Sequence, residues 1–184
     1  MTAPGENDRI SPREVVEADL DEILSLNNDA VPAVNRLARA DLARFAEQAR
    51  SFLVVDSPGA TGNGPGIAGF LIGLHGPGVP YESANYAWFC ERYDSFVYVD
   101  RIVIAASGRG AGVGSVLYTT FAERGRSAGA GVMLAEVNLR PRNERSLRFH
   151  ARHGFVSVGT RETDGGAKRV TMLEKRLDGP VVSS

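Results

Sequence analysis

The stretch Ser107-Gly-Arg-Gly-Ala-Gly-Val-Gly-Ser115 places four glycines and one arginine in nine positions. An apolar run at 96–104 that is typical of a strand precedes it, and apolar residues at helical spacing follow it from Val113. The start of a helix exposes about four backbone N–H groups without intrahelical acceptors, and it carries partial positive charge. Because glycines leave these groups open, the stretch predicts a phosphate-binding turn, to which Arg109 adds a charged donor. A tight connection without a ligand is the alternative that spacing alone leaves open.

Two familiar phosphate-binding loops do not fit this turn. A P-loop ends in Gly-Lys-Ser or Gly-Lys-Thr, and no lysine precedes Lys168. The dinucleotide pattern Gly-x-Gly-x-x-Gly needs a glycine where Val113 or Ser115 stands. The turn therefore belongs to a different kind of anion site.

Composition limits the classes of partner. The chain of 184 residues is expected to form one domain over 1–184, with a core at about 10–177 and flexible ends at 1–9 and 178–184. A net charge of −1 provides no overall field for nucleic acid or an acidic membrane, so neither is an expected partner. A single cysteine, Cys90, excludes an internal disulfide and is typical of a reducing compartment. With no signal peptide and no apolar run near the ~20 residues of a membrane span, a cytoplasmic location is expected.

Apolar patterning predicts a chain that mixes strands and helices, with hairpins near both ends. The fold class is therefore α+β, or mixed α/β, with a largely antiparallel sheet. The segment 76–95 reads as a long irregular loop rich in aromatic residues, and such loops are usually functional. Asp19 and Asp41 are expected to cap the first two helices. The expected strands are 10–16, 51–55, 67–74, 96–104, 132–137, 155–161 and 168–177, and the expected helices are 19–28, 41–50, 112–128 and 143–153.

Two landmarks resemble those of the GNAT N-acetyltransferase superfamily. The residues from Arg109 to Gly114 match its acetyl-CoA signature R/Q-x-x-G-x-G/A and lie, as there, between a strand and a helix. Downstream, Asn143 opens a short predicted helix that ends in Gly154-Phe155, which is similar to the second landmark. The two landmarks together are far more specific than either alone, and the likeness extends over about 10–177 in element order.

The resemblance implies a GNAT-like acyl-CoA N-acyltransferase fold, with a twisted and mostly antiparallel sheet whose fourth and fifth strands splay apart. It implies an enzyme that transfers the acetyl group of acetyl-CoA to a primary amine of a small molecule or a peptide, by direct attack on the thioester. Glu136 and Asn138 combined with Asn143 and Ser146 are similar to a subgroup of predicted, mostly bacterial acetyltransferases. A coenzyme A-binding sensor without turnover, another acyl donor such as succinyl-CoA, and a homodimer all stay open.

The resemblance also implies a cofactor site. Main-chain groups of the strand before the glycine turn would bond the pantetheine arm, the amides of the turn would take the pyrophosphate, and polar residues further on would lie along the cofactor. These residues are Ile102, Val103, Ile104, Arg109, Gly110, Ala111, Gly112, Val113, Gly114, Ser115, Asn138, Asn143, Ser146 and Phe149. Five arginines, Arg140, Arg142, Arg145, Arg148 and Arg152, serve either the cofactor's phosphates, an acidic substrate or a solvated helix face.

The catalytic groups are predicted less sharply. Many family members donate a proton to the leaving thiolate from a tyrosine, and His150 stands at that position here. His150 is either that donor or a buried, hydrogen-bonded histidine. The base is Glu136 or Asp100, each of which has an alternative structural role, and Glu82 is a third candidate. No metal site is expected.

The aromatic segment is the predicted acceptor pocket, because it offers flat apolar faces with a few polar tips. Its alternative role is that of a lid that packs on the sheet. The predicted substrate-binding residues are Tyr81, Glu82, Asn85, Tyr86, Trp88 and Arg92.

Overall fold

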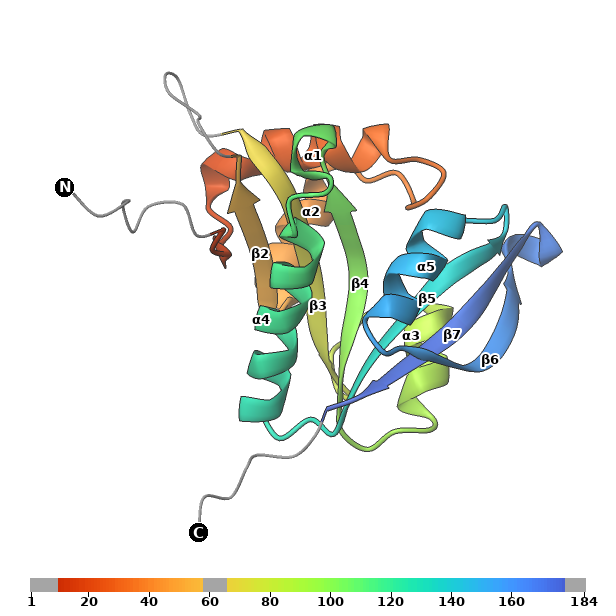
Figure 1. Ribbon diagram of the computed structural model, residues 1–184. Helices are drawn as coiled ribbons and strands as arrows, with labels where there is room; N and C mark the ends of the chain where they lie inside the picture. The colour runs from red at the N-terminus through yellow and green to blue at the C-terminus, as the bar shows by residue number, and fades with distance from the viewer. Residues whose placement is uncertain (1–9, 58–65, 178–184) are drawn as a thin grey trace, which may run out of the picture.

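Figure 1 shows the computed structural model, which describes residues 10–57 and 66–177. A seven-stranded sheet with the order β1-β2-β3-β4-β5-β7-β6 forms the centre. Neighbouring strands are antiparallel except β4 and β5, which are parallel, so the predicted mixed fold is confirmed. The strands are β1 (Arg13–Glu14), β2 (Ser51–Asp56), β3 (Ile67–Gly76), β4 (Phe96–Ile104), β5 (Val132–Arg140), β6 (Val156–Thr163) and β7 (Lys168–Arg176).

Helices cover both faces of the sheet. The helices α4 and α5 lie on one face, and α1, α2 and α3 lie on the other (Figure 1). No helix in the described ranges is long and apolar enough to cross a membrane. The helices are α1 (Leu20–Asp29), α2 (Arg39–Gln48), α3 (Ala84–Cys90), α4 (Val113–Ser127) and α5 (Glu144–Arg152), with three-ten turns η1 (Glu17–Asp19), η2 (Ala106–Gly108) and η3 (Asp164–Gly166).

The alternation of strand side chains explains this layering. In β2, Leu53 packs in the cluster under α4, whereas Val54 packs in the cluster under α1 and α2. Each strand therefore presents apolar residues to both faces, as a sheet covered on both sides requires. On the far half of the second face, Phe89 of α3 packs with Tyr98 of β4 and Leu134 of β5.

β4 and β5 diverge after a short contact, which confirms the predicted splay. They pair only at Val97 with Met133 and at Tyr98 with Leu134. Beyond this point β4 has one residue more than β3, because Val99 pairs with Gly73 and Arg101 with Ile72. Asp100 is the extra residue of this β-bulge, and a bulge bends its strand. The bend accompanies the divergence of β4 from β5, beyond which the facing main-chain groups of the two strands are not paired with each other.

The structure corrects the segment 76–95, which is not irregular throughout. It contains α3, whose N-terminus is capped by Ser83, because the Ser83 Oγ accepts from the Tyr86 amide at 3.3 Å. A helix of seven residues is too short to show a clear helical period in the sequence. The first predicted strand, 10–16, is also shorter than expected, since only Arg13–Glu14 pairs with β2.

The predicted caps Asp19 and Asp41 act differently from the expectation. Asp19 stands at the N-cap of α1, but its side chain forms no hydrogen bond to that helix. Asp41 lies inside α2, whose N-cap is Ala38. Instead, the Asp19 carboxylate accepts from the Val16 amide at 2.8 Å, and the Asp41 carboxylate accepts from the Ala38 amide at 2.8 Å. Both carboxylates thus bind an amide three residues earlier, and Asp19 also accepts two hydrogen bonds from Arg13.

Candidate active site

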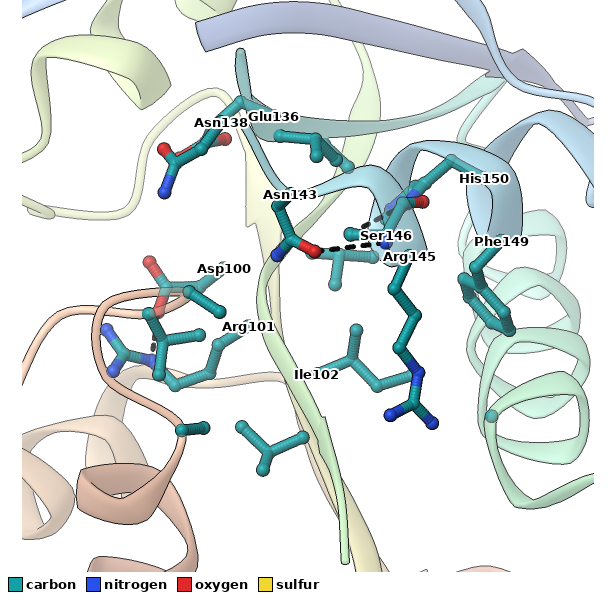
Figure 2. Close-up of a pocket in the computed structure, with 18 of the residues that line it drawn as sticks. Asp100, Arg101, Ile102, Glu136, Asn138, Asn143, Arg145, Ser146, Phe149 and His150 are labelled. Carbon is teal, nitrogen blue, oxygen red and sulfur yellow. Dashed lines mark hydrogen bonds and ion pairs between the residues drawn. The ribbon is translucent and has the colours of Figure 1, made fainter. Parts of the chain in front are cut away.

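A cavity of about 800 Å³ lies where β4 and β5 separate. It extends from the glycine turn and α5 to the segment that precedes α3. Figure 2 shows side chains of β4, β5 and α5 that line it. The three catalytic candidates Glu136, Asp100 and His150 line it. Of the predicted cofactor residues, only Ala111 is not part of its wall, and of the predicted substrate residues Tyr81, Glu82 and Asn85 are.

The glycine turn presents free amides to this cavity. Gly110 and Gly112 have φ angles of +80° and +84°, in the left-handed region that favours glycine. The first helical bond of α4 runs from the Val116 amide to the Gly112 carbonyl at 3.0 Å. The amides of Val113, Gly114 and Ser115 therefore have no acceptor within the helix, as an anion site at a helix start requires.

Positive charge gathers at this end of the cavity. Arg109 of the turn and Arg145 and Arg152 of α5 line it, and none of the three forms an ion pair within the described part of the chain. α5 is placed by its cap, because the Asn143 Oδ1 accepts from the Ser146 amide at 3.1 Å. Of the other predicted arginines, Arg142 and Arg148 pair with Glu144, and Arg140 pairs with Glu162.

Glu136 lies at the opposite end, on β5 just beyond its last pairing with β4. Its Oε1 accepts from the Tyr98 hydroxyl at 2.9 Å and from the Asn85 side-chain amide at 3.1 Å. Its Oε2 is buried and has no hydrogen-bond partner among the described residues. Burial, followed by the nearby charge of Asp100, raises the pKa of Glu136 to about 7.

Asp100, the other carboxylate near the fork, is fully engaged. Its Oδ2 accepts from the Arg101 Nε at 2.7 Å, and its Oδ1 accepts from the Tyr81 hydroxyl. The side chains of Asp100 and Arg101 are only 5% and 7% exposed. Arg101 also donates to the side chain of Asn27 at 2.9 Å, so the pair ties the bulge of β4 to α1. Asp100 thus has the structural partner that the sequence left open.

His150 is buried and uses both ring nitrogens. The Ser146 carbonyl lies 2.8 Å from Nδ1 and can only accept, so Nδ1 carries the proton. Nε2 then accepts from the Tyr118 hydroxyl at 2.7 Å. Burial lowers the pKa of His150 to about 4, which keeps the ring neutral near pH 7. This arrangement leaves His150 no free N–H group to donate.

Two residues of the site were not found from the sequence. Tyr118 of α4 reads as one more apolar position of an amphipathic helix, but its hydroxyl meets His150. Arg161 of β6 donates to the main-chain carbonyl of Ala84 and, at 3.3 Å, to the Oδ1 of Asn85. Because arginine can only donate, it directs the Asn85 Oδ1 toward itself and leaves the Nδ2 for Glu136.

Three predicted substrate residues lie outside the cavity. The Tyr86 hydroxyl donates to the His75 carbonyl at 3.2 Å within the core. Trp88 packs over Gly159 of β6, and the Arg92 guanidinium lies 4.0 Å from the centre of its ring. Tyr86 and Trp88 thus pack on the sheet, as the alternative role of a lid describes, and substrate binding by these three residues stays a prediction.

Comparison with known proteins identifies the family. A model of the acetyltransferase (GNAT) family matches residues 20–155, and no curated protein matches the sequence significantly. Ard1 from Thermoplasma volcanium is similar in structure, with a TM-score of 0.70, 15% identity and coverage of 91% of this chain and 97% of that one. An N-acetyltransferase from Staphylococcus aureus Mu50 has a TM-score of 0.66, 21% identity and coverage of 92% and 99%.

A third similar structure is yncA from Salmonella typhimurium with its cofactor acetyl-CoA, at a TM-score of 0.66, 18% identity and coverage of 96% and 99%. At such identities the structural likeness shows the fold. The family model matches more than half of the residues, and it agrees with the two sequence landmarks and the forked sheet. The chain therefore belongs to the acetyltransferase (GNAT) family.

Proposed function

We propose that this protein transfers the acetyl group of acetyl-CoA to a primary amine and that Glu136 is the general base. The observation that carries the proposal is the Oε2 of Glu136, a buried carboxylate oxygen without a partner in the described residues, on a side chain whose residue lines the cavity. A buried acceptor that nothing satisfies is rare in proteins, and a ligand's N–H group would satisfy it.

The groups that line the cavity suit the parts of coenzyme A. The free amides from Val113 to Ser115 and the side chains of Arg109 and Arg145 offer donors for phosphates. Between them and Glu136, β4 and β5 no longer pair, so their main-chain groups can bond an extended, amide-containing arm. The acetyl-CoA bound to the similar Salmonella protein supports this choice of donor.

Acetyl-CoA would supply a thioester, whose carbonyl carbon is open to attack. The amine nitrogen forms the new C–N bond, the C–S bond breaks, and coenzyme A leaves as a thiolate, which takes up from water a proton equivalent to the one that the nitrogen loses. The amine attacks in its neutral form, and its nitrogen becomes positively charged as the C–N bond forms, so a base must take a proton from that nitrogen. A pKa of about 7 lets Glu136 be ionised at neutral pH and still accept that proton effectively. Main-chain N–H groups that line the fork can stabilise the charge on the thioester oxygen.

Asp100 and His150 have supporting roles in this proposal. Both oxygens of Asp100 already accept hydrogen bonds, so it is a poor proton acceptor compared with Glu136. Its charge nevertheless raises the pKa of Glu136. His150 holds the Tyr118 hydroxyl and connects α5 to α4. Because the single cysteine is typical of a reducing compartment, we place the reaction in the cytoplasm.

Release of free thiol from acetyl-CoA, measured over a panel of primary amines, tests the proposal. Wild type should release thiol with at least one amine, and Glu136→Gln should lose most of that rate but bind coenzyme A as tightly by calorimetry. Binding without release on any amine would favour the alternative, a coenzyme A sensor. A rate in Glu136→Gln equal to that of wild type would remove Glu136 from the mechanism.

A further inference from the structure

The cavity is divided by charge. Its glycine-turn end carries Arg109, Arg145 and Arg152, and the ion pairs of the described residues include none of the three. The carboxylates that line the cavity belong to the other end, to the segment before α3, the two strands of the fork and the turn before β7. They are Glu82, Asp100, Glu136 and Asp164. In Figure 2, Asp100 and Glu136 lie on the strands, apart from the Arg145 guanidinium.

The two cations that line the cavity at its acidic end are already compensated. Arg101 is paired with Asp100 at 2.7 Å, and both side chains are buried. Lys168 is paired with Asp164 at 2.9 Å. To gain a partner on the cavity wall, an acceptor that carried a carboxylate or a phosphate beside its amine would therefore have to break one of these two ion pairs. Arg161 lies outside that wall, where it donates to Ala84 and Asn85. Such an acceptor would also place a second negative charge near Glu136.

Two carboxylates at the same end lack a cation. Among the described residues, Glu136 accepts hydrogen bonds only from the neutral groups of Tyr98 and Asn85. Glu82 is exposed at the cavity and forms no ion pair with any described residue. The main chain on both sides of Glu82 is anchored, because the Tyr81 hydroxyl donates to Asp100 and the Asn85 side chain donates to Glu136. Glu82 is thus held between two residues that contact the carboxylates of the fork.

We propose that the acceptor is a primary amine whose other groups are neutral or positively charged, and that Glu82 binds a second positive charge of a diamine acceptor. The inference rests on the proposed function and adds the chemical class of the substrate. Glu136 takes the proton of the reacting amine, and Glu82 attracts the distal ammonium group without taking part in the transfer. The selectivity follows from charge, so it does not require a pocket shaped for one compound.

Three amines of matched length test this inference: 1,5-diaminopentane, 5-aminopentan-1-ol and 5-aminopentanoate. They differ only in whether the distal group is positive, neutral or negative. For each we would measure kcat/KM for acetyl transfer and, by calorimetry, the affinity for the complex of the protein with coenzyme A. We expect the order diamine, amino alcohol, amino acid in both quantities, with steps of about threefold, the size of a partly exposed ion pair.

Glu82→Gln should bring the ratio of diamine to amino alcohol down to about one, because the only change is a lost charge. Glu91→Gln is the matched control, since Glu91 is an exposed carboxylate that pairs with Arg92 outside the cavity. That variant should keep the wild-type ratio. Equal affinities for the three amines, a preference for 5-aminopentanoate, or no binding of any of them would overturn the inference. Binding in the expected order without acetyl transfer would support it and contradict the proposed function instead.

Discussion

The hydroxyl of Tyr98 on β4 donates to the carboxylate of Glu136 on β5 at 2.9 Å, across the point where the two strands part. Tyr98 belongs to the last pair of the ladder, with Leu134, and Glu136 lies two residues further along β5. The alternation of side chains along a strand places Leu134 and Glu136 on the same face. The fork is therefore joined at its base by one side-chain hydrogen bond, which uses one oxygen of Glu136 and leaves the other for a ligand.

The first prediction concerns stability. Burial raises the pKa of Glu136 from its ordinary value of 4.5 to about 7, so the unfolded chain releases this proton at lower pH than the folded one. Stability contributed by the protonated group is complete below pH 4.5 and is lost as the pH rises through 7, by up to about 3 kcal/mol. Glu136→Gln does not titrate there. The melting temperature of the variant minus that of wild type should therefore increase between pH 4.5 and 8. A difference that stays constant over this range would contradict the burial of an ionising carboxyl.

A second prediction concerns Arg161, which we regard as a positioning residue. Without its guanidinium, the Asn85 amide can turn its oxygen toward Glu136, and the loss of a donor favours the protonated carboxyl. In Arg161→Met, the acid limb of the pH dependence of kcat/KM should move to higher pH. Arg176→Met, which removes an exposed arginine of β7 that does not line the cavity, is the control. If the acid limb of kcat/KM lies at the same pH in both variants, Arg161 does not orient the Asn85 amide.

A third prediction tests the turn. Gly112→Ala forces a side chain into the left-handed region, which costs about 1–2 kcal/mol, although a Cβ there would meet no other atom. The backbone should shift to relieve this strain and move the amides that follow. We expect coenzyme A to bind about tenfold more weakly, as for one lost hydrogen bond to a charged group. Gly131→Ala, where a Cβ also meets nothing and φ is not positive, should bind it normally. Equal affinities in the two variants would mean that the turn does not hold the phosphates.

The fourth prediction separates the two roles considered for His150. Tyr118→Phe leaves the buried Nε2 of His150 without its donor, which should lower the free energy of unfolding by about 1–3 kcal/mol. His150→Phe should likewise destabilise the protein, and both variants should keep a kcat close to that of wild type. Denaturant unfolding and steady-state kinetics measure the two effects. A large fall in kcat with unchanged stability would restore His150 as the proton donor.

Features that depend on neighbours in the chain were predictable. The span of β4 was predicted correctly from its apolar run, and the start of α4 after the glycines and of α5 at Asn143 were predicted to within a residue. Each depends on local periodicity, backbone freedom or a cap. The divergence of β4 and β5 was also predicted, but only from the resemblance to a family.

Features that join distant segments were not predictable. The bulge at Asp100 is defined only by the register against β3, and the partners of Glu136 come from β4 and α3. From the sequence, the residues Tyr81, Glu82, Asn85, Tyr86 and Trp88 were all predicted to bind substrate. In the structure they lie in different places, since the turn of α3 brings Asn85 to the fork and directs Trp88 toward β6.

The central claim, that Glu136 removes the proton of the amine, is tested most directly by the pH dependence of acetyl transfer to 1,5-diaminopentane. The measured quantity is kcat/KM, expressed per concentration of the diamine form whose reacting amine is neutral, so that titration of the substrate is removed. For wild type it should rise through a pKa near 7 and then level off, following the ionisation of Glu136. In Glu136→Gln it should fall by about 10²–10⁴ and lose this rise, with the affinity for coenzyme A unchanged. A variant that keeps the same rise near pH 7 would contradict the account.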